Sequence, residues 1–337
     1  MRTIVLEEPG RFREADIAPP RPGTGEALVR VRRIGICGTD LHAYRGRQPF
    51  FTYPRVLGHE LAVEVVALGP GADGPAPGTV CTVMPYLSCG ACTACRRGRT
   101  NCCASLRVLG VHVDGGMAEY LSVPAANLIA GGGLSLDQLA LVENQSIGAH
   151  AVRRAAPEPD ERALVVGAGP IGLGVVQALR AQGVDTVVTD VSEERLRFCR
   201  ELLGVRQPVD ARGDALPALR EATSGELFTL VFDATGNAAS MQRSFEFVAS
   251  GGRLVFVGLV QADITFHDPE FHRREMTLFA SRNATRRDFE WVMAAMGDGT
   301  IRSGPLITHR VEFGDAAEAF PSWLDPRSGV IKAVVTV

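Results

Sequence analysis

Four closely spaced cysteines give the sequence its clearest chemical signal. The chain of 337 residues has eight cysteines, and four of them follow the spacing Cys89-x2-Cys92-x2-Cys95-x7-Cys103. Four thiolates can enclose a zinc ion tetrahedrally with no open position, which is the arrangement of a structural zinc site. The neighbouring Cys102 is an alternative to Cys103 as the fourth ligand. We therefore predict a structural zinc lobe over residues 89–103.

A second group of possible metal ligands lies nearer the N-terminus. It combines the thiolate of Cys37, the imidazole of His59 and the carboxylates of Asp40 and Glu60. Sulfur, nitrogen and oxygen ligands together suit a zinc site that keeps one position open for chemistry. A lone histidine is commonly a hydrogen-bonded core residue, but His59 stands next to Glu60 and has Cys37 available. The grouping predicts a catalytic metal.

A glycine-rich turn joins a predicted strand, 163–166, to a predicted helix, 171–181. The first glycine allows a tight turn, the second lets a pyrophosphate approach the backbone, and the third lets the helix pack closely on the strand. The phosphates would lie at the positive end of the helix. The expected contacts in this turn are Gly167, Gly169, Pro170, Ile171 and Gly172.

Asp190 ends the next predicted strand, where a carboxylate accepts hydrogen bonds from the adenosine ribose and repels a 2′-phosphate. This favours NAD over NADP, although Arg195 is placed to hold such a phosphate. Two later strands end in small residues where a flat nicotinamide could lie. The contacts expected there are Thr235, Val257, Gly258 and Leu259.

The pattern of predicted secondary structure changes near residue 150. Residues 1 to about 150 contain short alternating strands such as 27–36 and 117–123, with a turn-rich loop at 69–78. From residue 162, strands at 163–166, 186–189, 227–232 and 253–257 alternate with helices at 171–181, 193–203 and 241–248. Such alternation predicts an α/β fold with a parallel sheet covered on both faces. A last helix, 286–296, and a last strand, 330–337, follow.

Composition argues against two classes of partner. The net charge is −3, so no basic face for nucleic acid or for an anionic membrane surface is indicated. The N-terminus lacks the charged-then-apolar layout of a signal peptide, and no apolar run reaches the length of a membrane span. Cysteines clustered as metal ligands suit a reducing compartment. We expect a cytoplasmic protein.

Together these motifs resemble the zinc-containing medium-chain dehydrogenase/reductase superfamily over the whole chain. Within it the sequence looks most like the bacterial sugar-acid and polyol branch, of the L-galactonate or L-gulonate 5-dehydrogenase type. The narrower likeness lies in four segments: 48–60, Gly110-Val-His112, Asp268-Pro-Glu270-Phe-His272 and Ser281-Arg-Asn-Ala-Thr285.

The resemblance implies a domain organisation. A GroES-like, mostly-β catalytic domain would span 1–150 and include the zinc lobe. A doubly wound Rossmann domain would span 151–286, and residues 287–337 would return to the catalytic domain. It also implies an NAD-dependent enzyme with two zinc ions per chain, assembled as a homodimer or homotetramer.

The resemblance also assigns roles around the catalytic zinc. Cys37 and His59 would be ligands, and Glu60 a ligand or an alternative one. Asp40 would orient His59 through its ring N–H. Glu143 falls where relatives carry a glutamate that can complete the coordination sphere, although Asn144-Gln145 replaces the residues that usually follow it.

Proton transfer and substrate binding complete the expected site. Thr39 would bridge the substrate hydroxyl to a proton path that ends at His42. The substrate would be a polyhydroxylated small molecule, oxidised at a secondary hydroxyl. If it is a sugar acid, its carboxylate needs a cation, and Arg45 and Arg282 are the candidates.

Three alternatives remain at this point. A polyol, threonine or general secondary alcohol dehydrogenase would share the architecture and differ only in its pocket. A zinc-free reductase or nucleotide-dependent regulator would lack both cysteine-containing motifs. A zinc-ribbon nucleic-acid module would need a basic surface around the lobe.

Overall fold

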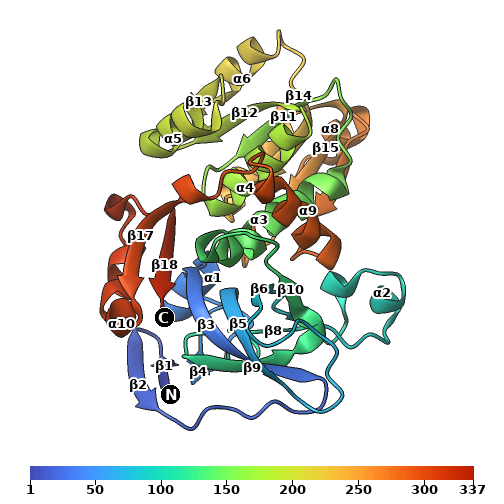
Figure 1. Cartoon of the computed structure of the whole chain (residues 1–337). Helices are drawn as coiled ribbons and strands as arrows, with labels where there is room; N and C mark the ends of the chain where they lie inside the picture. The colour runs from blue at the N-terminus through green and yellow to red at the C-terminus, as the bar shows by residue number, and fades with distance from the viewer. The chain divides into compact units, whose positions relative to one another are not determined.

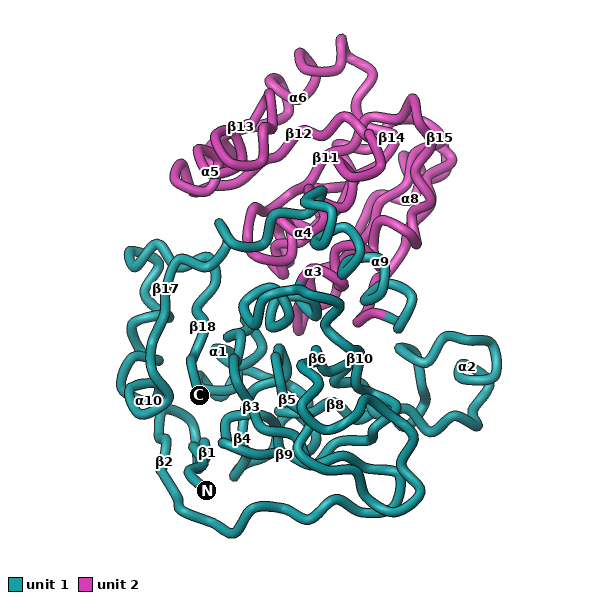
Figure 2. The backbone as a smooth tube through the Cα atoms, in the orientation of Figure 1, with its two compact units in different colours: residues 1–144, 285–337 teal, residues 145–284 magenta.

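The computed structural model describes all 337 residues and divides them into two compact units. Unit 1 comprises residues 1–144 and 285–337, and unit 2 comprises 145–284 (Figure 2). The first division falls inside helix α3 (Leu136–Ala155). The boundaries expected from the sequence, after residues 150 and 286, lie a few residues later in each case.

Unit 1 is a mostly antiparallel β structure (Figure 1). Its main sheet has seven strands, in the order β10-β6-β5-β3-β18-β17, with β9 pairing β3. In that order the strands are β10 (Leu128–Ala130), β6 (Val80–Val83), β5 (Glu60–Leu68), β3 (Glu26–Ile36), β18 (Lys332–Thr336), β17 (Ile307–Glu312) and β9 (Tyr120–Pro124). A smaller sheet contains β2 (Arg11–Asp16), β1 (Arg2–Glu8) and β4 (Arg55–Val56).

The centre of this sheet is the longest strand, β3. It pairs antiparallel with β5, β9 and β18, so the last strand of the chain lies beside one of the first. Its β-branched residues Val29 and Val31 are fully buried, as the alternation predicted. Ile34 is also buried, because a register shift between Val31 and Arg33 changes the phase of the strand. This central position fixes both ends of β3, including the end that leads to Cys37.

A two-stranded ribbon, β7 (Tyr86–Leu87) with β8 (Arg107–Val108), carries the cysteine lobe. Within the lobe the chain forms only one helical turn, α2 (Thr93–Arg96), and a 3₁₀ turn, η1 (Thr100–Cys102). So little regular structure offers few backbone hydrogen bonds and a small core. A segment with so little other structure is of the kind that a bound metal can stabilise.

A further group of helices in unit 1 lies near the chain's end. It includes α9 (Arg286–Gly297), as predicted, and the short helices η4 (Gly304–Leu306), η5 (Phe313–Asp315), α10 (Ala316–Ala319), η6 (Phe320–Leu324) and η7 (Pro326–Ser328). Thr285 and Asp288 form a capping box at the start of α9. Phe320 and Trp323 bury their rings against the β core.

Unit 2 contains one parallel sheet of six strands. Their spatial order, β13-β12-β11-β14-β15-β16, is the doubly wound order 3-2-1-4-5-6. In chain order they are β11 (Arg162–Val166), β12 (Asp185–Asp190), β13 (Pro208–Asp210), β14 (Phe228–Asp233), β15 (Val248–Phe256) and β16 (Thr277–Ala280). The central strands β11 and β14 are buried on both faces, which confirms the expected covering.

The helices of unit 2 begin and end at recognisable signals. They are α4 (Pro170–Ala181), α5 (Glu193–Leu203), α6 (Leu216–Ala222), α7 (Ala238–Arg243) and α8 (Asp268–Arg273), together with the C-terminal part of α3. Ser192 caps α5 by accepting from the amide of Arg195, and Gly204 ends it in the left-handed conformation.

The sequence-based prediction of one helix over 241–248 was wrong. Helix α7 ends at Arg243, residues 244–247 form the 3₁₀ turn η3, and Val248 already begins β15. Ser244 explains the change, because its hydroxyl bonds to the Asp233 carboxylate at 2.9 Å and to the Ser240 carbonyl at 3.0 Å. A side chain held this way competes with continued helix. No helix in either unit is long and apolar enough to cross a membrane.

Candidate active site and nucleotide-binding turn

Cys37 lies where β3 ends and the short helix α1 (Gly38–Tyr44) begins. It is the N-cap residue of α1, and Asp40 Oδ2 accepts a 2.9 Å hydrogen bond from its backbone amide. This helix was not predicted, because seven residues are too short for a helical period to be visible in the sequence. The carboxylate of Asp40 therefore fixes the backbone that presents the thiol.

His59 and Glu60 precede and begin β5, the strand beside β3. Glu60 pairs with Gly35, and a Cβ on Gly35 would lie 2.3 Å from a carboxylate oxygen of Glu60. Only glycine fits at that position. The close pairing brings the ligand atoms of Cys37, His59 and Glu60 within 4.8 Å of one another.

Glu60 also has a partner that the sequence analysis did not assign. The ammonium of Lys332, on β18, lies 2.7 and 2.8 Å from its two carboxylate oxygens and 3.1 Å from the carbonyl of Ile36. Both side chains are completely buried. Lys332 is the chain's only lysine and lies in an otherwise apolar final strand, which was the sequence signal for an internal partner.

His59 faces Asp40, as expected for an orienting carboxylate, but at 3.7 Å between Nδ1 and Oδ1. That distance is an ion pair and exceeds a hydrogen bond, and neither atom has a hydrogen-bond partner. Burial by itself lowers the pKa of His59, but the charges of Asp40 and Cys37 raise it well above its usual range. Burial raises the pKa of Asp40, against the charge of His59.

Glu143 lies on α3 with its carboxylate buried, and its Oε1 accepts a hydrogen bond from the hydroxyl of Tyr86. Burial raises the pKa of Glu143, while the charge of His59 acts in the opposite direction. Tyr86, at the base of the cysteine lobe, was not identified from sequence. No motif marks a tyrosine three positions before a cysteine cluster as a partner of a distant glutamate.

The donors fit a zinc ion. Cys37 offers sulfur, His59 nitrogen and Glu60 oxygen, which matches a catalytic site with an exchangeable position. Glu143 lies near enough for the charge of His59 to act on its pKa. Of the buried acidic groups around them, Glu60 faces Lys332 and Asp40 faces His59. The unpartnered Nδ1 of His59 and Oδ1 of Asp40 lie close enough to pair with little movement once the ring is held by a metal.

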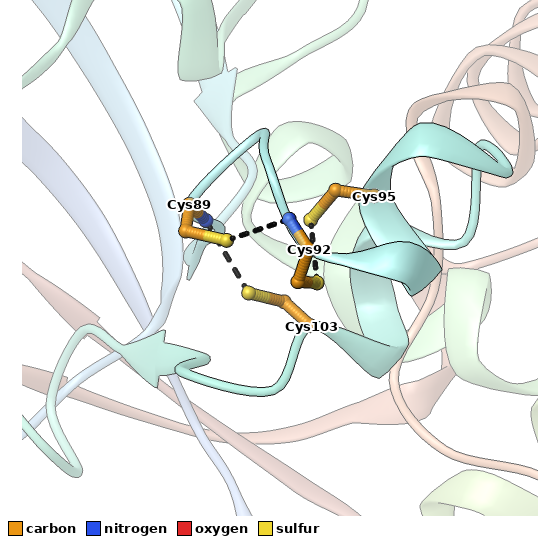
Figure 3. Close-up of side chains that lie close together, drawn as sticks. All are labelled: Cys89, Cys92, Cys95 and Cys103. Atoms are coloured by element: carbon orange, nitrogen blue, oxygen red, sulfur yellow. Dashed lines mark hydrogen bonds between the residues drawn. The ribbon is translucent and has the colours of Figure 1, made fainter.

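The four lobe cysteines converge on a common centre (Figure 3). Their sulfurs lie within 4.8 Å of one another, and those of Cys92 and Cys95 are 3.5 Å apart. Amide N–H groups of Ala91 and Cys92 help lower the pKa of Cys89 to about 6, which favours the thiolate that binds metal. The exposed Cys102 lies outside this group.

Thr39 and His42 share one face of α1, because residues three apart in a helix are neighbours. Thr39 is half-buried and His42 is exposed, so they run outward from Cys37 toward solvent. Burial and the charges of Arg45 and Arg47 lower the pKa of His42. The imidazole is therefore neutral at pH 7 and able to accept a proton.

The glycine turn of unit 2 follows β11, beside the point where the strand order of the sheet reverses. Gly167 has φ +95°, a conformation that favours glycine. A Cβ on Gly172 would lie 1.8 Å from the Gly167 carbonyl oxygen, so the close approach needs glycine there too. A Cβ on Gly169 would have Arg195 as its nearest neighbour, at 3.9 Å. Pro170 and Ile171 are the first two residues of α4.

Asp190, the last residue of β12, is oriented by this turn. Its Oδ2 accepts from the amide of Ala168 at 2.6 Å, and its Oδ1 from the amide of Ser192 at 2.7 Å. Arg195 lies 4.0 Å from the same carboxylate. The acid is thus fixed beside the phosphate-binding turn and keeps free lone pairs for further donors.

The remaining expected contacts lie after β14 and β15. Thr235 donates to Asp233 from both its amide and its hydroxyl, at 2.9 and 2.6 Å. A Cβ on Gly258 would meet the amide nitrogen of Gly236 at 2.4 Å, so the two segments touch through glycines. Val257 is half-buried, and Leu259 is 68% exposed.

The two arginines proposed for substrate binding lie in different units. Arg45, in unit 1, donates to the carbonyl of Leu324 at 2.7 Å and is exposed. Arg282, in unit 2, is exposed and directly follows Ser281, whose amide bonds to Phe256.

Comparison with known proteins identifies the family of the chain. Residues 23–132 match the alcohol dehydrogenase GroES-like domain, and residues 170–298 match the zinc-binding dehydrogenase domain. L-galactonate-5-dehydrogenase of Escherichia coli K12 is 43% identical over 336 residues, covering 100% of this chain and 99% of its own. D-altritol 5-dehydrogenase of Agrobacterium fabrum is 32% identical and covers 95% of both.

A solved structure shares the whole fold. An alcohol dehydrogenase from E. coli CFT073, in complex with NADH, superimposes with a TM-score of 0.94 at 31% identity and covers 100% of this chain and 99% of that one. The fold and the site together define an alcohol dehydrogenase that acts on a CH–OH group. The chain belongs to the zinc-binding dehydrogenase family, with a GroES-like domain and a Rossmann-type domain.

Proposed function

We propose that this enzyme oxidises the C5 hydroxyl of a sugar acid of the L-galactonate or L-gulonate type to a ketone, with NAD as the hydride acceptor. The observation that carries the proposal is the 43% identity to L-galactonate-5-dehydrogenase along the entire chain. The metal-ligand group in unit 1 and the nucleotide turn in unit 2 supply the required chemistry.

Zinc in the catalytic site supplies a Lewis acid that polarises the substrate hydroxyl. Cys37, His59 and Glu60 form the ligand group, and the buried Glu143 carboxylate feels the charge of His59. In this proposal Cys37 and His59 would hold the ion, and Glu60 and Glu143 would share the remaining protein position. The four-cysteine lobe holds the second zinc and acts on stability alone. A carboxylate ligand, unlike a further thiolate, would let water or substrate exchange readily at the metal.

Thr39 and His42 carry the proton released from the substrate hydroxyl. The Thr39 hydroxyl would take up this proton as its own proton passes on, by way of the cofactor ribose, to the imidazole of His42. His42 would then release a proton to solvent from the exposed side of α1. Both roles rest on the shared helix face and on the neutral imidazole.

Asp190 selects NAD in this proposal. Its carboxylate accepts the ribose hydroxyls and repels a 2′-phosphate. Arg195 at 4.0 Å leaves a cation in place that would favour NADP if the acid were removed.

A carboxylate on the substrate needs a cationic partner, and a guanidinium offers two donors in one plane. Arg282 is the preferred candidate, because it follows β16, the last strand of the parallel sheet that carries the nucleotide turn. The Arg282 segment is also part of the sequence likeness to sugar-acid dehydrogenases.

The test compares each acid with its neutral counterpart. NADH formation is followed with L-galactonate, L-gulonate, galactitol, sorbitol, D-altritol and L-threonine. Arg282→Ala should raise KM for the acids much more than for the alditols. The control is Arg206→Ala, because Arg206 bonds to Asp185 at the opposite end of β12 from Asp190; it should change KM for neither class of substrate. Equal use of acids and alditols, with Arg45 and Arg282 both dispensable, would refute the sugar-acid assignment.

A neutral polyol is the second candidate, because D-altritol 5-dehydrogenase is 32% identical over nearly the same length. The same panel distinguishes it. A polyol enzyme would turn over D-altritol or galactitol at least as well as either acid.

We also propose a cytoplasmic location and a homodimer or homotetramer. All eight cysteines are free thiols, and the lobe needs four of them as thiolates, which a reducing compartment preserves. Strand β16 ends the parallel sheet with three of its four residues exposed, and an open edge of this kind can pair with a second copy. Sedimentation analysis would measure the oligomer, and a monomer would contradict it.

A further inference from the structure

Besides Asp40, two buried carboxylates stand near the Cys37–His59 pair, Glu60 and Glu143, and the partners of these two differ in kind. Glu60 faces the ammonium of Lys332 with both oxygens. Glu143 instead accepts one hydrogen bond, on Oε1, from the neutral hydroxyl of Tyr86. The charge of Glu60 is thus compensated by a cation, while the hydrogen bond to Glu143 orients the carboxylate without neutralising it.

We propose that Tyr86 is a positioning residue that holds the carboxylate of Glu143 in place to coordinate the catalytic zinc. The inference deepens the metal site of the proposed function and rests on it. It assigns Tyr86 an effect exerted through Glu143, without contact of its own with the metal.

Tyr86 itself is rigidly held. Its backbone pairs with Val108 in the β7–β8 ribbon, and its carbonyl accepts from Asn127 Nδ2 at 3.2 Å. Its ring packs edge-on against the buried Phe289 of α9, with centroids 6.2 Å apart at 86°. With backbone and ring both fixed, the hydroxyl has little freedom to follow a moving carboxylate.

The hydrogen bond from Tyr86 leaves one carboxylate oxygen of Glu143 available to bind a metal. It uses Oε1 and leaves Oε2 to accept from another partner. Groups that hydrogen-bond a ligating carboxylate orient it, and their loss typically weakens metal binding by roughly 10- to 100-fold. Because Tyr86 is 4% exposed and Glu143 is 5% exposed, water does not readily replace the missing donor.

The test measures zinc affinity rather than turnover. Zinc is titrated away from the intact enzyme with a chromophoric chelator, which separates a weaker, catalytic site from the tighter four-thiolate site. Tyr86→Phe should weaken the catalytic site roughly tenfold or more and leave the lobe unchanged. Tyr44→Phe is the matched control, because its hydroxyl donates to the Gly10 carbonyl at 2.9 Å, away from the site.

A double-mutant cycle separates positioning from general damage. In a Glu143→Ala background, Tyr86→Phe should cause no further loss of zinc affinity, because the group it positions is gone. Unchanged affinity in Tyr86→Phe, or an equal loss with and without Glu143, would overturn the proposal. Wild-type enzyme with only one zinc site would instead refute the catalytic metal itself, whatever Tyr86 does.

Discussion

The ammonium of Lys332 sits within 2.8 Å of both carboxylate oxygens of Glu60, and neither side chain reaches solvent. The pair joins the last strand of the chain, β18, to β5 across the end of β3 that leads to Cys37. A buried pair of this kind adds little net stability, but each charge becomes costly when the other is removed.

Lys332→Met should therefore destabilise the protein by about 3–5 kcal/mol, because it leaves Glu60 buried and uncompensated. Urea unfolding followed by circular dichroism would measure the loss. Adding Glu60→Gln to Lys332→Met should recover part of it, since the uncompensated charge is then gone. If the single and double variants are equally unstable, the pair is not the cause.

Loss of one lobe ligand should affect stability rather than catalysis directly. We expect Cys92→Ser to abolish zinc binding at the lobe and to lower the melting temperature by several degrees, because the lobe has little other structure. Zinc content per chain and calorimetry are the readouts. Cys102→Ser, outside the cluster, should alter neither, and a loss of zinc in that variant would return Cys102 to the ligand set.

Asp190→Ser should weaken NAD binding roughly tenfold or more and shift preference toward NADP, because Arg195 can then meet the 2′-phosphate without the opposing acid. The ratio of kcat/KM for the two cofactors measures the shift. Asp210→Ser, at the exposed end of the next strand, should leave that ratio unchanged. Wild-type enzyme that prefers NADP would contradict the role of Asp190.

The proton path predicts a pH dependence. The pKa of His42 is lowered from its ordinary value by burial and by Arg45 and Arg47, so the imidazole accepts protons above that pKa and stops as the pH falls through it. The acid limb of kcat/KM should lie below about pH 6.5. Arg47→Gln removes a positive charge, so the limb should move to higher pH.

His42→Gln supplies the decisive comparison for that path. It should lower kcat roughly tenfold or more and remove the acid limb. A profile that is unchanged in His42→Gln would assign the limb to another group.

Features that depend on the spacing of residues within a short segment could be predicted from the sequence. The turn at 167–172 needs glycine for reasons local to a strand–turn–helix unit, and the α/β alternation of unit 2 follows from buried central strands. The grouping of Cys37 with His59 and Glu60 came from residue chemistry, and the register of β3 with β5 places them together.

What could not be predicted depends on distant pairing. Tyr86 reaches Glu143 across 57 positions of sequence, and Lys332 reaches Glu60 across 272. Neither contact leaves a periodic pattern. Strands β13 and β16 were also missed, since three or four residues at a sheet's edge are too few to stand out from the loops around them.

The most direct test of the whole account follows the hydride itself. L-galactonate carrying deuterium at C5 is incubated with the zinc-loaded enzyme and NAD, and both products are examined by mass spectrometry. We predict NADH that contains the deuterium, together with the 5-keto acid, and no reaction after chelation of the weaker zinc. Failure to reduce NAD, or NADH without deuterium, would contradict oxidation at the C5 hydroxyl.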